Sequence, residues 1–153
     1  MGTLREQFTA ELKTAMLAKD APRVSAIRMI TARLKDVDIA ARPKGVTAVP
    51  DEEIIAMLRG MVKSRRESAD LYRQGGRPEL MAKEETEIAV IEVFLPQQMG
   101  ADAMAAAVAE AIAETGAVGI KEMGKVMAAL RAKHGAVLDM AAAGPLVKAK
   151  LGG

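Results

Sequence analysis

The segment from Gly75 to Pro96 restricts the fold of this chain more than any other. Two adjacent glycines, Gly75 and Gly76, permit positive backbone dihedral angles and end a preceding helix, while Pro78 suits the first turn of a new one. Apolar residues then recur at spacings of three and four until Pro96 stops the helix. The segment therefore predicts an amphipathic helix with both ends marked in the sequence.

Glu84 is the charged residue on the apolar stripe of this helix. A buried carboxylate requires a partner, and we expect a structural ion pair with Arg28 or Arg33 of an earlier helix. The neighbouring glutamates could also be read as metal ligands. Metal sites of this kind take histidines from other helices, and His134 lies in a different part of the chain. We expect no metal and no cofactor.

The composition favours an all-α protein. Half of the 153 residues are apolar, Phe8, Tyr72 and Phe94 are the only aromatic residues, and alanine, methionine and leucine abound. No apolar run approaches the roughly 20 residues that span a bilayer. Cysteine is absent, which excludes disulfides and thiolate chemistry. We therefore expect a soluble, cytoplasmic protein that does not associate with a membrane.

Helical periodicity and helix-end signals divide the chain into seven predicted helices. They run from the Thr3 capping box to the break at Asp20–Pro22, through Val24–Val37, from Asp51 to about Gln74, from Pro78 to Leu95, from Asp102 to Thr115, through Ile120–Leu130, and through Leu146–Leu151. Residues 42–50 are predicted to form an exposed, mobile loop. We expect an N-terminal four-helix bundle (1–96), a linker (97–100) and a C-terminal three-helix bundle (101–153).

Two glycines and a proline affect the last helices. Gly124 costs a helix about 1 kcal/mol relative to alanine, which suggests close backbone packing at that point. Pro145, after Gly144, is tolerated only in a first turn. The last helix should therefore start late or be distorted.

The basic residues gather in two segments although the net charge is only +2. Residues 59–77 and 121–151 each contain six basic and two acidic residues. In the first segment, the acidic helix from Pro78 is a natural intramolecular partner for Arg65, Arg66 and the Arg73–Arg77 region. In the second, we expect nucleic-acid phosphates to be contacted by Lys121, Lys125, Arg131, Lys133, Lys148 and Lys150, with ordinary solvated lysines as the alternative.

The residues do not form a recognisable catalytic constellation. Ser25, Ser64 and Ser68 lie inside predicted helices instead of on a strained turn, and His134 lies at a helix end. No glycine-rich phosphate loop follows a strand. We therefore expect no catalytic residues and no autonomous activity.

Three blocks of sequence carry a resemblance over most of the chain: GGRPELMAKEETEIAVIEVFLPQQM, KEMGKVMAALRAKHG and VKAKL. The chain resembles the GatB/YqeY family, which shares its C-terminal part with the tail of the B subunit of aspartyl/glutamyl-tRNA amidotransferase. The resemblance implies a four-helix and a three-helix bundle, and Gly144–Pro145 departs from the family's usual final helix.

The resemblance implies a non-catalytic accessory module that binds tRNA or docks onto a tRNA-handling protein complex. Two alternatives stay open. By association with the family name, the chain would take part in carbon-nitrogen ligation with glutamine as amido-N-donor. It would otherwise be a helical protein-protein adaptor.

Overall fold

A computed structural model describes residues 2–135 and 137–152. These residues form seven α-helices and two short 3-10 turns and contain no strand, which confirms the all-α prediction for the part of the chain that is described. The chain divides into two compact units, Met1–Leu95 and Pro96–Gly153. Each unit is described by itself.

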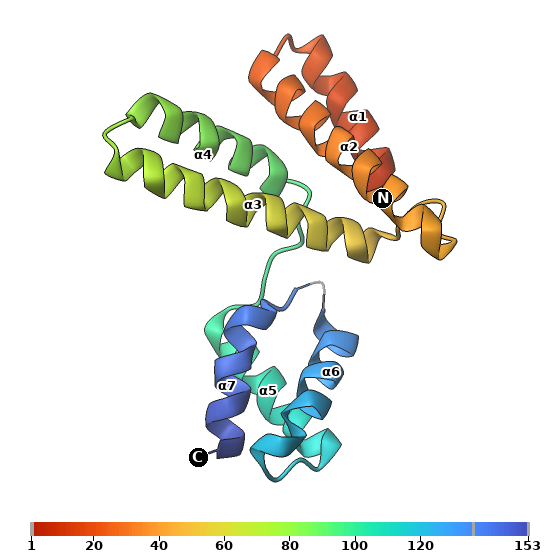
Figure 1. Ribbon diagram of the computed structural model, residues 1–153, viewed down its shortest axis with the longest axis vertical. Helices are drawn as coiled ribbons and strands as arrows, with labels where there is room; N and C mark the ends of the chain where they lie inside the picture. Colours follow the sequence, from red (N-terminus) through yellow and green to blue (C-terminus); the bar gives the residue numbers. More distant parts are fainter. Residues whose placement is uncertain (1, 136, 153) are drawn as a thin grey trace. The chain divides into compact units, whose positions relative to one another are not determined.

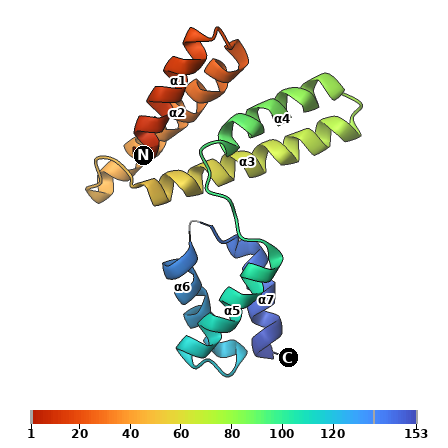
Figure 2. The same ribbon diagram turned by 180° about the vertical axis from the view of Figure 1, so that it is seen from behind.

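The first unit is made of two helical hairpins (Figures 1 and 2). The elements are α1 (Leu4–Leu17), α2 (Ala21–Ala41), the 3-10 turn η1 (Arg42–Lys44), α3 (Asp51–Gln74) and α4 (Pro78–Glu92). Helices α3 and α4 lie side by side along most of their length, and α2 contacts both of them. The α1–α2 hairpin therefore packs across the α3–α4 hairpin.

The helix ends follow the signals in the sequence. Thr3 Oγ1 accepts a hydrogen bond from the Glu6 N–H at 3.3 Å, which is one half of the expected capping box, and α1 begins at Leu4. Gly76 has φ of +70° in the α3–α4 turn, a conformation that glycine adopts without steric cost. Pro78 then occupies the first turn of α4.

Apolar side chains from all four helices form one core in the first unit. Phe8, Ile27, Ile54, Leu58 and Ile91 are fully buried there. The ring of Phe8 on α1 meets the ring of Phe94, just after α4, edge to face with centroids 4.8 Å apart. This aromatic contact joins α1 to the segment that directly follows α4.

The segment between α2 and α3 differs from the expected open loop. Arg42–Lys44 form the turn η1, and Val49 is buried, with 3% of its surface exposed. The Val49 N–H donates to Asp38 Oδ1 at 2.9 Å, and its carbonyl accepts from Arg5 Nη2 at 3.0 Å. The prediction of an exposed segment is wrong at Val49 because residues far apart in the sequence hold this backbone in place.

The second unit contains three α-helices. They are α5 (Ala101–Thr115), α6 (Met123–His134), which follows the 3-10 turn η2 (Ile120–Glu122), and α7 (Met140–Gly152). Its core is built from Met104, Val108, Val126, Leu130 and Val147, with small alanines between them. Alanine allows the helix backbones to approach closely, so this small core is closed by short side chains.

Pro145 lies inside α7 and not in its first turn. The prediction that this helix starts late is wrong, since α7 begins at Met140. The Ala142 and Ala143 N–H groups donate to the Asp139 carbonyl, and Ala143 and Val147 are buried on either side of the proline. Burial of this face supports a helix that proline disfavours.

Among residues 2–135 and 137–152, no single helix is long and apolar enough to cross a membrane. A sufficient length of apolar helix is reached only by taking two segments together, Ala101–Thr115 and Ile120–His134, and these are bent by 96° relative to each other.

Candidate nucleic-acid interface

All six basic residues expected to contact phosphates are exposed on the second unit. Lys121 lies on η2, and α6 carries Lys125 in its first turn. The other four are Arg131 and Lys133 near the end of α6 and Lys148 and Lys150 near the end of α7.

The structure brings four of these residues to one end of the unit. The C-terminal end of α7 lies beside η2. A Cβ atom added to Gly152 of α7 would lie only 3.6 Å from Cδ1 of Ile120 in η2. We call the end of the unit that carries Lys121, Lys125, Lys148 and Lys150 the basic end. Arg131 lies farther along α6, about 9 Å from Lys125 at a rise of about 1.5 Å per residue.

Lys133 is separated from the basic end and is paired. Its Nζ contacts a carboxylate oxygen of Glu110 and lies 3.4 Å from Oε1 of Glu114, both on α5. The hydrogen bond from Lys133 lowers the pKa of Glu110, and the same bond raises the pKa of Lys133. A phosphate at this position would compete with two carboxylates, so Lys133 is less suited to an RNA contact than the basic end.

The lysines of the basic end are largely uncompensated. Lys125 Nζ lies 3.8 Å from a carboxylate oxygen of Glu122, and both side chains reach solvent. Within the described part of the chain, no ion pair is formed by Lys121, Lys148 or Lys150. These three ammonium groups are available to an anionic partner.

The glycines beside the lysines leave backbone accessible. A Cβ atom placed on Gly119 or Gly124 would meet no heavy atom within 4 Å. The expectation that Gly124 marks close packing is therefore wrong for the described residues. The first turn of α6 instead presents open backbone next to Lys121 and Lys125, where an external molecule can approach closely.

The other basic segment is largely neutralised within its own unit. Arg65 Nε on α3 lies 3.2 Å from Glu87 Oε2 on α4, and Arg66 lies 3.5 Å from Glu92. Two further pairs, Arg73 with Asp70 and Arg77 with Glu79, are exposed. The acidic helix α4 is thus an intramolecular partner of α3, as its charge predicted.

The prediction that Glu84 forms an ion pair with Arg28 or Arg33 is wrong. Within the described part of the chain Glu84 forms no ion pair, and the half-buried pair on this face joins Glu87 to Arg65 with side chains 20% and 15% exposed. Glu87 lies almost one turn beyond Glu84, and its ion pair is with Arg65 on α3. Neither Arg28 nor Arg33 takes part.

The hydroxyls and the imidazole that the sequence singled out lie on three different helices. Ser25 is on α2, Ser64 and Ser68 are on α3, and His134 ends α6 in the other unit. In the ranges 2–135 and 137–152, no group of three histidine, aspartate or glutamate side chains is placed to hold a metal ion. The described residues also include no buried charged or polar side chain.

The described residues form an all-α protein of two compact helical units. The second unit carries exposed lysines at its basic end. The chain belongs to the family described as Yqey-like protein, whose model matches residues 5–151.

Curated relatives are similar over about half of the chain. "Altered inheritance of mitochondria protein 41, mitochondrial" from Eremothecium gossypii is 35% identical over 85 residues, which is 56% of this chain and 45% of that protein. Proteins of the same name are 29% identical over 87 residues in Saccharomyces cerevisiae and 30% over 87 in Lachancea thermotolerans. The match spans 45% of each of these relatives.

The relatives contradict the expectation of a cytoplasmic protein, since their names state that they are mitochondrial. The absence of cysteine and of a long apolar run led to that expectation. Both features restrict disulfides and membrane spans, and neither distinguishes one aqueous compartment from another.

Proposed function

We propose that this protein is a non-catalytic accessory module that binds the sugar-phosphate backbone of tRNA through its basic end, alone or within a tRNA-handling complex. The observation that carries the proposal is the position of Lys121, Lys125, Lys148 and Lys150 at the end of the unit where α7 meets η2, near the open backbone of Gly119 and Gly124. Four exposed cations at one end of a small unit offer phosphates a compact set of contacts.

The composition of the second unit restricts the kind of recognition. No Phe, Tyr or Trp follows Phe94, so the imidazole of His134 is the one aromatic ring in this unit on which a base could stack. Lysine ammonium groups and backbone N–H groups contact phosphates without reading the sequence. The proposed binding is therefore to backbone shape and depends strongly on salt.

We propose that the two compact units are the domains expected from the sequence, a four-helix N-terminal bundle and a three-helix C-terminal bundle joined near residues 97–100. In this arrangement the RNA contact belongs to the C-terminal domain. The N-terminal domain, in which Arg65 and Arg66 of α3 are paired with glutamates of α4, is free for another role.

A helical protein-protein adaptor is the second candidate. Val118 and Ile120, next to the basic end, are 87% and 46% exposed, and apolar side chains of this kind suit a protein partner. A part in carbon-nitrogen ligation would likewise require a partner, which would supply the nucleophile and the glutamine site.

Binding of bulk tRNA by the full chain at two salt concentrations tests the proposal. A variant with Lys121, Lys125, Lys148 and Lys150 changed to alanine should bind much more weakly. If each lysine neutralises one phosphate, the slope of log affinity against log salt should fall by about 3 to 4. Titration of fluorescently labelled tRNA measures both quantities.

The matched control changes four exposed lysines of the first unit, Lys13, Lys35, Lys44 and Lys63, to alanine, because none of them forms an ion pair with a described residue. This control has the same net charge as the test variant. Equal losses in both variants would show only non-specific attraction and would contradict the proposal. Absence of binding to wild-type protein at low salt would favour the adaptor.

A further inference from the structure

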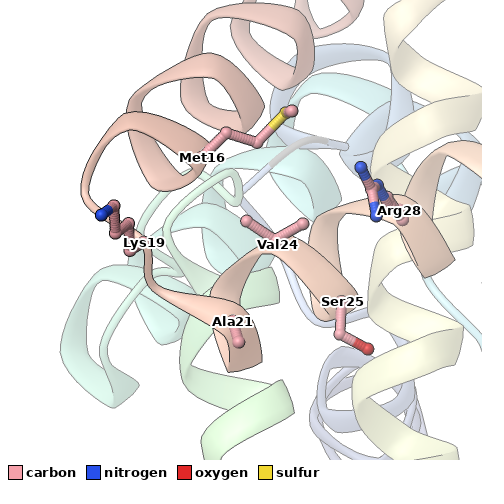
Figure 3. Close-up of a pocket in the computed structure, with 6 residues that line it drawn as sticks. All are labelled: Met16, Lys19, Ala21, Val24, Ser25 and Arg28. Carbon is pink, nitrogen blue, oxygen red and sulfur yellow. The ribbon is translucent and has the colours of Figure 1, made fainter.

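A surface hollow lies at the tip of the α1–α2 hairpin, outside the basic end. It has a volume of about 540 Å³ and is lined by Met16, Lys19, Ala21, Val24, Ser25 and Arg28 (Figure 3). We call it the tip hollow. It lies in the first unit and takes no part in the proposed contact with tRNA.

The floor of the tip hollow is apolar and its sides are positively charged. Figure 3 shows Lys19 and Arg28 on opposite sides of Val24, with Met16 reaching over from α1. Within the described part of the chain neither cation forms an ion pair. Met16 is 51% exposed and the adjacent Leu17 is 75% exposed, so apolar surface continues beyond the hollow.

The hollow is held in shape by the backbone of the hairpin turn. Lys19 adopts φ of +57°, its N–H donates to the Met16 carbonyl at 3.1 Å, and the Asp20 N–H donates to the Ala15 carbonyl at 3.0 Å. These bonds close the end of α1. A preformed turn places Lys19 beside α2 without requiring rearrangement when a ligand binds.

We propose that the tip hollow is a docking site for an acidic amphipathic helix of a partner protein. Ala21, Val24, Ser25 and Arg28 lie on one stripe of α2 that is about 10 Å long. A helix laid along it would place apolar side chains over Met16 and Val24. Carboxylates about two turns apart on that helix would meet Lys19 and Arg28.

The chemistry of the hollow favours a protein over other anions. A small metabolite is normally buried over most of its surface, whereas this hollow is formed by one hairpin and is open to solvent. An RNA phosphate would leave the apolar floor unused. A flat membrane surface would not fill a concave site between two cations.

The test uses the full, isotopically labelled chain and a helical peptide of about 18 residues as the probe. The peptide carries Glu at positions i and i+7 and Leu at i+3 and i+4, and the control peptide has Lys in place of each Glu. We expect saturable binding of the acidic peptide alone. Amide NMR signals should shift for residues 16–28 and stay in place for Lys44 and Lys63.

Two variants assign the binding to the hollow. Lys19→Glu combined with Arg28→Glu should weaken the acidic peptide by at least about tenfold, because both attractions become repulsions. Lys44→Glu combined with Lys63→Glu makes the same change in net charge at exposed lysines outside the hollow and should have little effect. Met16→Ser should also weaken binding, since it removes apolar contact and keeps the charge.

Three results would overturn the proposal. The first is no saturable binding of the acidic peptide, and the second is an equal loss in both double variants. The third is binding of vesicles made of equal parts phosphatidylcholine and phosphatidylserine through Lys19 and Arg28 without binding of the peptide, which would assign the hollow to a membrane surface. Circular dichroism spectra that match the wild type would show that each variant is folded.

Discussion

Arg5 and Asp38 form a bidentate ion pair in the first unit. Two guanidinium nitrogens of Arg5 donate to the two carboxylate oxygens of Asp38, each at 2.8 Å. The pKa of Asp38 is lowered from 3.8 to about 2. The hydrogen bond from Arg5 is the largest cause, and the hydrogen bond from the Val49 N–H is the next. One carboxylate thus joins α1, α2 and the segment before α3.

Asp38→Asn is expected to lower the free energy of unfolding at pH 7 by about 1 kcal/mol, a value reduced for the solvent that reaches both side chains. Because the pKa of Asp38 is lower in the folded state, its contribution is complete above pH 3.8 and is lost as the pH falls through about 2. The difference between wild type and variant should therefore shrink over this range. Urea unfolding followed by circular dichroism measures it.

Asp36→Asn is the matched control, because Asp36 is exposed and forms no ion pair with a described residue. It should have little effect at either pH. A cost for Asp38→Asn that is the same at pH 2 and pH 7 would contradict an ionic role for Asp38.

Single residues show where reasoning from sequence stops. The stripe on α4 predicted an ion pair of Glu84 with Arg28 or Arg33, which is wrong, and the structure pairs Glu87 with Arg65 instead. Residues three apart on a helix differ by about 60° in direction, and the sequence does not say which neighbouring helix lies on which side. The Arg5–Asp38 pair was missed for the same reason, since 33 residues separate its members.

At the scale of elements, periodicity and end signals placed the helices approximately, except for α7, which begins at Met140 and earlier than expected. The third predicted helix ends at Gln74 in the structure, as expected, because Gly75 and Gly76 follow it. The turn η1 and the buried Val49 were not predicted. The burial of Val49 depends on tertiary contacts with Arg5 of α1 and Asp38 of α2 and has no local pattern, whereas η1 is closed by the local bond from the Gly45 N–H to the Arg42 carbonyl.

Pro145 should weaken α7 because it has no N–H to donate to the carbonyl of Ala141. Pro145→Ala restores that donor, and we expect local stability to rise by about 1–2 kcal/mol. The N–H groups of Leu146 and Val147 should exchange with solvent roughly 5 to 30 times more slowly, as measured by NMR. Unchanged or faster exchange in α7 would show that the helix is adapted to the proline.

At the scale of the whole molecule, the two basic segments differ in how far their charges are paired, which the net charge conceals. The chain as a whole carries +2, but Arg65 and Arg66 on α3 pair with glutamates of α4, while Lys121, Lys148 and Lys150 form no ion pair with a described residue. All six candidate residues could be selected from local charge alone. Their division into four at one end and two farther along α6 required the packing of α7 against η2.

Lysine footprinting of the full chain with and without tRNA tests the central claim most directly. Acetylation of exposed lysines, read by mass spectrometry, should be suppressed by tRNA at Lys121, Lys125, Lys148 and Lys150. Lys13, Lys35, Lys44 and Lys63 serve as internal controls and should react equally in both samples. Protection confined to the basic end is the result we predict, and equal protection of both sets, or of neither, would contradict the account.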